Sequence, residues 1–249
     1  MRIGISALSF NLKEALEICE NNKEINHIEI GIDNLSDVEK IRKYEDQIKK
    51  LNLTVGIHLP MELNSCEDIE FIRDKWVQYI IILDEKLSFF SISYYNMHLG
   101  YVISDRLEKN KERYLQNAVN FFNELYKKRK LTMTIENTYT KRGDLSNVGT
   151  SVEDFTYIFE KQKDLGFCYD TGHNLISKSD YYLLDEKIKV IHLSDNNKKE
   201  DEHNGIFKGK LSQKELNHII NLNPQFLILE MKFNYINESL HILKQKYLK

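Results

Sequence analysis

The sequence predicts an α/β protein with a single domain over residues 1–249, a (β/α)8 TIM barrel with its active site at the C-terminal ends of the strands. Three observations support this prediction. The length of 249 residues is typical of one such barrel. Short apolar runs alternate with amphipathic helical patterns along the chain. Six of these runs end on His, Asp or Glu, and parallel strands deliver such residues to one common site.

The expected elements form eight strand–helix units in chain order. Apolar and β-branched runs predict strands at 2–6, 27–31, 54–58, 91–98, 131–136, 165–170, 189–193 and 226–230. Helical patterns follow them at 11–22, after 36, and at 67–86, 105–129, 151–162, 173–186 (in short pieces), 212–221 and 237–247. Ser36 with Glu39 and Ser212 with Glu215 have capping-box spacing, and Ser151 also opens a helix.

Strands separated by helices require crossover connections, so the sheet is expected to be parallel and to close into a barrel. An open doubly wound sheet is the alternative. No GxGxxG turn follows the first strand, and the polar strand ends are spread over six strands instead of one switch point. Both features favour the barrel.

The composition is that of an ordinary soluble globular protein, with 41% hydrophobic and 29% charged residues. The net charge of −3 does not indicate a polyanionic partner. No apolar window predicts a membrane span and no signal-peptide pattern begins the chain, so a cytoplasmic protein is expected, and it could form a homo-oligomer. Cys19, Cys66 and Cys168 do not suggest a disulfide framework or a zinc knuckle.

Four strand ends carry the residues that matter most. Glu136, Asp170, His192 and Glu230 end the last four predicted strands in order, so they are neighbours around one side of the barrel mouth. Three carboxylates and one imidazole suit a divalent ion such as Zn, Mn, Mg or Co. Any one of them alone is more often a satisfied polar residue, but four in successive strands indicate a metal site.

Further ligand types surround these four: His58, His98, His173, Asp201 and His203. Asp201 and His203 lie in the long segment 194–211, which with 137–150 is expected to cover a substrate. In a second interpretation His58 and His98 hydrogen-bond the substrate, and the Asp201 segment is a solvated turn. His27, His218 and His241 are expected to be structural.

The ordered segments HLP (58–60), HLG (98–100), IENT (135–138), YDTGH (169–173), IHLSD (191–195), DEH (201–203) and LILE (227–230) resemble those of the xylose-isomerase-like TIM-barrel superfamily. That superfamily holds sugar isomerases and epimerases alongside zinc-dependent apurinic endonucleases of the endonuclease IV type. The resemblance implies that Glu136, Asp170, His192 and Glu230 are the shared metal ligands. It also implies that all nine positions, if filled as in the endonucleases, hold three zinc ions.

Departures from the endonuclease pattern fall on segments that handle DNA. Met61 stands where those enzymes usually carry an aromatic residue, Tyr139 and Thr140 alter the segment after Glu136, and Phe207 alters the glycine loop. These departures favour a divalent-metal-dependent isomerase or epimerase of a small sugar or sugar phosphate, which transfers a proton through a metal-stabilised enediolate.

Under this hypothesis one ion suffices. The resemblance assigns proton transfer to Glu136 and Glu230, while His173 holds a substrate oxygen and Lys208 or Arg142 meets a phosphate. The alternative hypothesis is an endonuclease IV-like zinc phosphodiesterase with three ions, and only this alternative has DNA as a partner. The number of bound ions separates the two.

Overall fold

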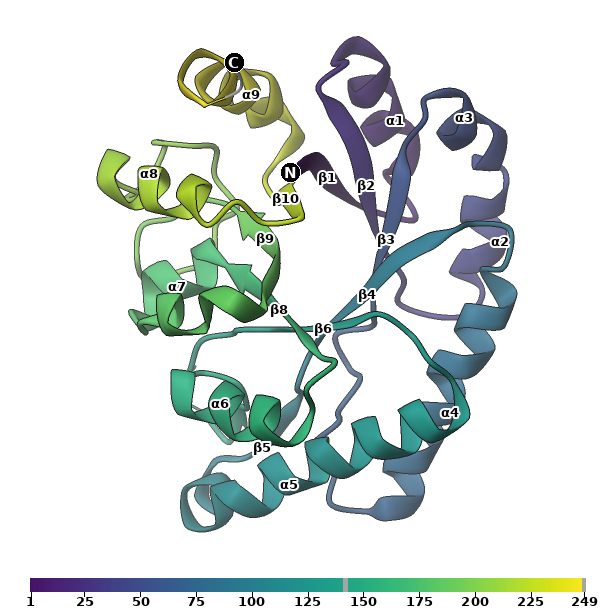
Figure 1. The fold of residues 1–249 in the computed structure, drawn as a ribbon, viewed down its shortest axis with the longest axis vertical. Helices are drawn as coiled ribbons and strands as arrows, with labels where there is room; N and C mark the ends of the chain where they lie inside the picture. The colour runs from purple at the N-terminus through teal and green to yellow at the C-terminus, as the bar shows by residue number, and fades with distance from the viewer. Residues whose placement is uncertain (141–142, 248–249) are drawn as a thin grey trace.

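The computed structural model describes residues 1–140 and 143–247. Eight parallel strands of this described chain close into a barrel in the order β1-β10-β9-β8-β6-β4-β3-β2. Their bounds are β1 Arg2–Leu8, β2 Ile25–Gly31, β3 Thr54–His58, β4 Ile92–His98, β6 Met133–Glu136, β8 Gly166–Asp170, β9 Ile188–Leu193 and β10 Phe226–Leu229. Figure 1 shows helices arranged around the ring of strands, which confirms the predicted (β/α)8 TIM barrel.

The helices lie where the amphipathic patterns predict them, with one difference. They are α1 Leu12–Asn21, α2 Asp37–Arg42, α3 Glu45–Lys50, α4 Glu70–Lys86, α5 Ser104–Lys128, α6 Val152–Lys161, α7 Thr171–Ser177, α8 Gln213–Asn221 and α9 Ile236–Lys246, with 3-10 turns η1 Tyr181–Lys187 and η2 Phe233–Tyr235. The helix expected after Ser36 is divided into α2 and α3. None of these described helices is long and apolar enough to cross a membrane.

The two predicted capping boxes have different outcomes. Ser212 accepts from the backbone N–H of Glu215, and the Glu215 carboxylate accepts in return from the N–H of Ser212, which confirms the box at α8. The box at Ser36 is wrong. Its backbone is helical (φ −72°, ψ −18°) and its hydroxyl turns back to the Asn34 side chain, so it makes no cap bond.

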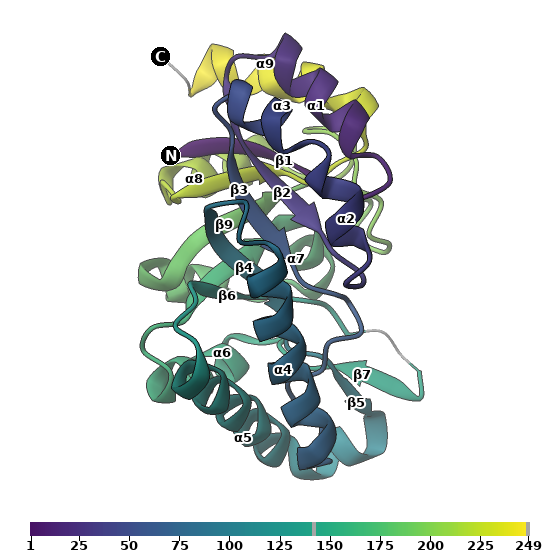
Figure 2. The same cartoon turned by 90° about the vertical axis from the view of Figure 1, so that its right-hand side faces the viewer.

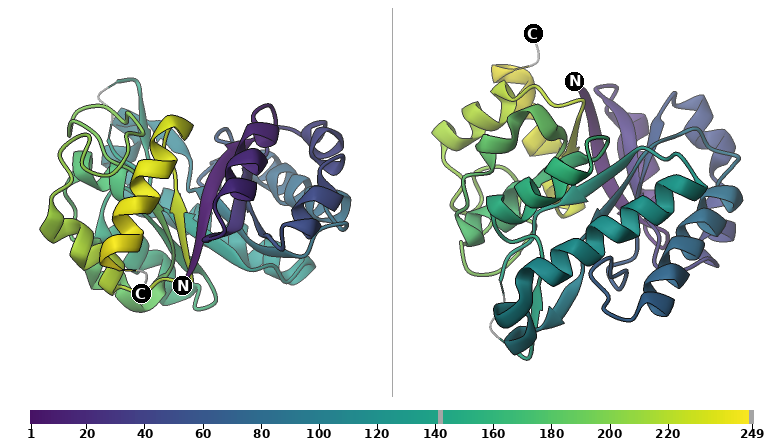
Figure 3. Two further views of the ribbon diagram at one scale, coloured as in Figure 1. Left: turned by 90° about the horizontal axis from the view of Figure 1, so that it is seen from above. Right: turned by 60° about the horizontal axis from the view of Figure 1, so that its bottom comes forward.

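The barrel closes where the two ends of the chain meet. β1 pairs in parallel with both β10 and β2, from Arg2 opposite Phe226 to Ile5 opposite Leu229 on the β10 side. Figure 3 shows α1 and α9 on either side of this closure. A small buried cluster fills the barrel interior and comprises Tyr94, Cys168, Val190, Phe226 and Ile228. The barrel interior is therefore filled by side chains, and a few polar ones such as Glu29 and Asn96 are buried among them.

Both long segments after strands are tied down by hydrogen bonds. In the segment after β6, β7 (Leu145–Asn147) pairs antiparallel with β5 (Tyr101–Ile103), and Figure 2 shows this pair apart from the barrel strands. In 194–211, the buried Asp195 carboxylate accepts backbone N–H groups of Gly209, Lys210 and Leu211 at 2.7–2.8 Å. A bridge between Asp195 and Asn204 fixes the other half of this segment.

Candidate metal centre

Glu136, the last residue of β6, lies at the centre of the predicted site and is 1% exposed. One carboxylate oxygen is 3.3 Å from Nε2 of His58 and 3.4 Å from Nδ1 of His192. The other is 3.1 Å from Nε2 of His98. The two oxygens of one carboxylate therefore face imidazoles from three different strands, because β3, β4 and β9 all end at the same rim.

These contacts form two ligand groups that share Glu136. His58, His98 and Glu136 each offer one atom within 4.8 Å of the others. Glu136, Asp170, His192 and Glu230 do the same on the neighbouring side of the rim. Glu136 belongs to both groups, and one of its oxygens faces His58 of the first group and His192 of the second, so this residue is placed to bind ions in both.

A third cluster comes from α7 and the 194–211 segment. Nε2 of His173 and Nε2 of His203 each lie 3.2 Å from the same oxygen of Asp201. Asp170 holds the start of α7 in place, since its carboxylate accepts the His173 N–H. The structure thus brings together all nine residues that the sequence analysis singled out, and the Asp201 segment is folded against the mouth instead of forming a solvated turn.

Several ligand atoms in this centre are buried without an aligned hydrogen-bond partner within the described chain. They are Nε2 of His98, Oδ2 of Asp170, Nδ1 of His192 and Oδ1 of Asp201. A buried polar atom with no partner costs about 1–3 kcal/mol, so four at one place require an explanation. All four belong to residue types that bind divalent cations, and a cation would satisfy them together.

The pKa values of the site residues also indicate a cation site. Burial raises the pKa of Asp170 well above its ordinary range, and the charges of Glu230 and Glu136 contribute to the rise. Burial alone would lower the pKa of His58, but the hydrogen bond and charge of Glu136 outweigh it and bring this pKa to about 9. Protons here take the place that a cation would fill, because both neutralise a dense cluster of carboxylates.

The residues Glu29, Asn96 and Asn137 complete the site, and the sequence analysis missed them. Asn96 donates from its amide to the Glu136 carboxylate, and the Asn137 side chain accepts the N–H of Asp170 at 2.7 Å. Glu29 contacts Nε2 of His192 at 3.0 Å. Glu29 and Asn96 are polar residues with apolar neighbours inside strand runs, and that position was the available signal.

A cavity of about 680 Å³ opens onto the ligand groups. His58, His98, Glu136 and Glu230 border it, and its apolar wall comprises Leu8, Ile32, Leu59, Met61, Met231 and Phe233. Its size is in the range of small-molecule sites.

Lys208 and Arg142 were expected to contact a phosphate. Lys208 pairs with Glu238 of α9 at 2.7 Å and is not among the described residues that line the cavity. Arg142 lies outside the described residues. Lys232, between β10 and η2, is the one Lys or Arg among the described residues that line the cavity. Within the described chain its ammonium has no ion-pair partner.

The family of this chain follows from a comparison with known protein families. The model of the xylose isomerase-like TIM barrel matches residues 10–246. The chain belongs to this family. A probable endonuclease 4 of Thermosipho africanus is 26% identical over 208 residues, covering 74% of this chain and 72% of that protein. Uncharacterized protein MJ1614 of Methanocaldococcus jannaschii is 26% identical over 234 residues, covering 85% and 84%.

Solved xylose isomerase-like barrels of both functional kinds share the fold. A D-tagatose 3-epimerase-like protein superposes with a TM-score of 0.80 at 22% identity, covering 98% of this chain and 96% of its own. Endonuclease IV of Thermus thermophilus gives 0.67 at 18% identity, covering 98% of each. At these identities the likeness establishes the fold, so the choice between the two activities rests on the site itself.

Proposed function

We propose that the protein is a divalent-metal-dependent phosphodiesterase of the endonuclease IV kind, with three ions per chain and an abasic DNA or other sugar phosphoester as substrate. The observation that carries this proposal is the position of Glu136 between two ligand groups. One of its oxygens faces His58 of the first group and His192 of the second, and the other oxygen faces His98 of the first group. The cluster of His173, Asp201 and His203 provides a third position.

The residues divide into ligands and substrate contacts. Ions bound by the three groups would supply an activated water and stabilise the attacking and leaving oxygens of a phosphoryl group. Asp170 and His192 are fully buried and do not border the cavity, so they serve only to hold an ion. His58, His98 and Glu230 border it and face the substrate.

The cavity supports an anionic substrate with an apolar part. Lys232 is placed to neutralise a phosphate that does not reach the ions, because its ammonium has no carboxylate partner in the described chain. Its backbone is fixed, since the N–H of Lys232 donates to the carbonyl of His203 at 3.0 Å. The apolar wall with Met61 and Phe233 can receive the face of a sugar or base.

The same contacts weigh against the sequence-based preference for proton transfer by Glu136. A general base needs a free oxygen beside the substrate C–H. In this site both Glu136 oxygens are engaged by imidazoles, and Asn96 donates to one of them as well. Glu136 is thus better suited to bridging ions than to carrying a proton.

A sugar isomerase or epimerase is the second candidate, and one observation favours it. Glu230 borders the cavity with its side chain 22% exposed, so unlike Glu136 it has an accessible face. The cavity also has the size of a small-sugar site. In this case a single ion at Glu136, Asp170, His192 and Glu230 would be enough.

Elemental analysis combined with two assays tests the proposal. The expected result is about three equivalents of zinc or another divalent metal per chain and metal-dependent cleavage of an abasic duplex or of bis(p-nitrophenyl) phosphate. One equivalent of metal, no phosphoester cleavage, and exchange of a ketose C–H in deuterated water would overturn it in favour of the epimerase. Glu136→Gln purified in the same way controls for contaminating nucleases.

A further inference from the structure

Glu29 is outside the ligand groups but forms a buried pair with the group member His192. Glu29 is on β2 and is 1% exposed, and His192 is fully buried on β9. Nε2 of His192 lies 3.0 Å and 3.1 Å from the two oxygens of Glu29. The other ring nitrogen, Nδ1, faces Glu230 at 3.0 Å and belongs to the metal group. The imidazole therefore stands between a carboxylate and the candidate ion.

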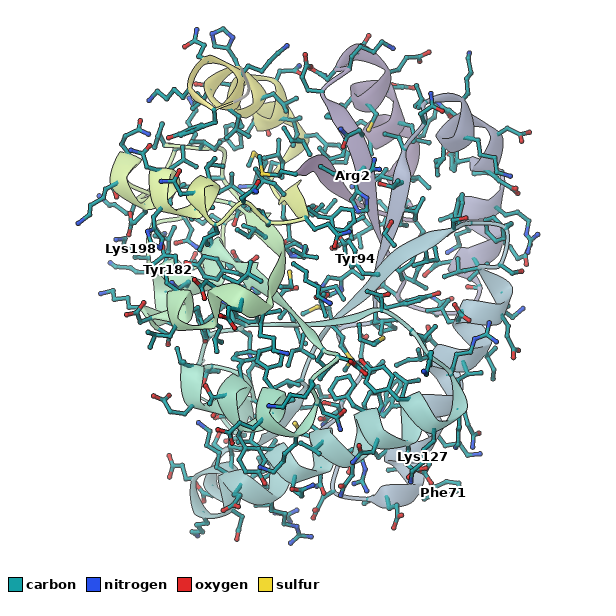
Figure 4. The ribbon with its side chains drawn as sticks, in the orientation of Figure 1. Arg2, Phe71, Tyr94, Lys127, Tyr182 and Lys198 are labelled. Atoms are coloured by element: carbon teal, nitrogen blue, oxygen red, sulfur yellow. The ribbon has the colours of Figure 1, made fainter. Side chains whose placement is uncertain are left out.

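A chain of hydrogen bonds holds Glu29 from the opposite side. The Tyr94 hydroxyl donates to Glu29 at 2.7 Å, and Figure 4 shows Tyr94 near the centre of the barrel. Nε2 of His27 lies 3.2 Å from the same hydroxyl, and Nδ1 of His27 lies 2.7 Å from the hydroxyl of Thr54. This chain links β2, β3 and β4 to the metal ligand on β9.

The donors and acceptors of this chain can be assigned from the Tyr94 end, while at the far end the Thr54 hydroxyl also lies 3.3 Å from the carbonyl of Asn26. Because Tyr94 donates its proton to Glu29, its oxygen accepts from the N–H at Nε2 of His27. Nδ1 of His27 is then an acceptor for Thr54, which requires a neutral ring. Burial agrees with this, since it lowers the pKa of His27 to about 3, with Arg2 contributing. Glu29 then accepts from the Tyr94 hydroxyl and from the N–H at Nε2 of His192.

We propose that Glu29 is a positioning residue that orients His192, keeps its proton on Nε2 and so directs the Nδ1 lone pair to the ion. Carboxylates that accept the second N–H of a metal-bound histidine fix its tautomer and raise its basicity. Tyr94 and His27 in turn fix the Glu29 carboxylate. The inference rests on the proposed metal centre with three ions.

Stepwise titration of the chelated protein with Co²⁺ tests this role in Glu29→Gln, which keeps the shape and removes the charge. The visible Co²⁺ spectrum and calorimetric affinities report each ion apart from turnover. We expect one of three ions to bind about 10-fold to 100-fold more weakly, with an altered spectrum, while the other two keep their affinity. Tyr94→Phe is the matched control, and it should weaken the same ion by a smaller factor, because one donor to Glu29 is lost.

The two remaining ions serve as an internal control for folding. Unchanged Co²⁺ affinity and spectrum in Glu29→Gln would overturn the positioning role while leaving the metal centre intact. Weakening of all three ions together with a lowered melting temperature would also overturn it, since Glu29 would then be a general structural residue. If the wild-type protein binds no divalent ion, the metal centre fails and this inference fails with it.

Discussion

At the scale of single residues, Glu136 determines how many ions the site can hold. It is the shared member of two ligand groups, and its oxygens lie 3.1–3.4 Å from three imidazoles. Burial alone would raise the pKa of Glu136, but the charges of the neighbouring imidazoles and the hydrogen bonds from His192 and His58 hold it well below its usual value. A neutral residue at position 136 should weaken metal binding in both ligand groups.

We predict that Glu136→Gln loses two of three ions. The amide offers one oxygen and no charge, so it cannot bridge, and metal-dependent turnover should fall by at least about a hundredfold. Elemental analysis after dialysis measures the remaining metal. His203→Ala is the comparison, because it belongs to the third cluster and should remove only one ion. Retention of all three ions in Glu136→Gln would contradict the bridging role.

Removal of the Lys232 ammonium should weaken the binding of an anionic substrate. Lys232→Met keeps most of the stem and removes the ammonium, so KM for an anionic substrate should rise about 10-fold to 100-fold, with little change in kcat. Metal content should not change, because Lys232 is not a ligand type. Lys208→Met is the matched control, since Lys208 pairs with Glu238. An equal effect of both variants would argue against a contact between Lys232 and the substrate.

At the scale of elements, the ligands come from two sources with different rigidity. His58, His98, Glu136 and Asp170 end strands of a closed barrel, so their backbone positions are fixed by neighbouring strands. The third cluster depends on the 194–211 segment, which carries Asp201 and His203. Asp195 anchors that segment through the N–H groups that its buried carboxylate accepts.

We predict that Asp195→Ala weakens the third ion selectively. Three backbone donors lose their acceptor, the segment loosens, and metal affinity at the Asp201 cluster should fall by about tenfold or more, as for other supporting residues. Competitive titration with a chromophoric chelator measures the three affinities. Asp195→Asn should have a smaller effect, because it retains the oxygen that receives Lys210 and Leu211. Equal loss at all three positions would show that the segment supports the whole barrel mouth.

The elements also explain how much the sequence could predict. A residue that ends an apolar run must lie at the barrel rim, so Glu136, Asp170 and His192 could be placed without coordinates. Glu29 lies inside a run, where the sequence does not tell a polar residue in the barrel interior from one on the outer face. The partner of Lys208 could not be predicted either, because Glu238 is 30 residues away on α9.

At the scale of the whole molecule, the closed barrel concentrates charge that the fold cannot neutralise alone. The hydrophobic core surrounds the strands, yet the ligand residues Glu136, Asp170 and His192 are at most 1% exposed. Removing charged groups from water costs several kcal/mol each unless they are paired. Protons and mutual ion pairs provide that pairing in the metal-free protein, and cations would provide it better, so metal and global stability should be linked.

This linkage predicts how the metal-free protein responds to alkaline pH. The pKa of His203 rises to about 9 through its hydrogen bond to Asp201, and the pKa of His58 also reaches about 9, both above the ordinary histidine value of 6.5. A raised folded-state pKa gives stability that is complete below pH 6.5 and is lost as the pH rises through about 9. Chelated protein should therefore melt at progressively lower temperature across this window. Metal-loaded protein should not, because bound ions displace these protons. Calorimetry of both forms between about pH 6 and pH 9 measures the difference, and parallel curves would contradict the link between metal and proton in this centre.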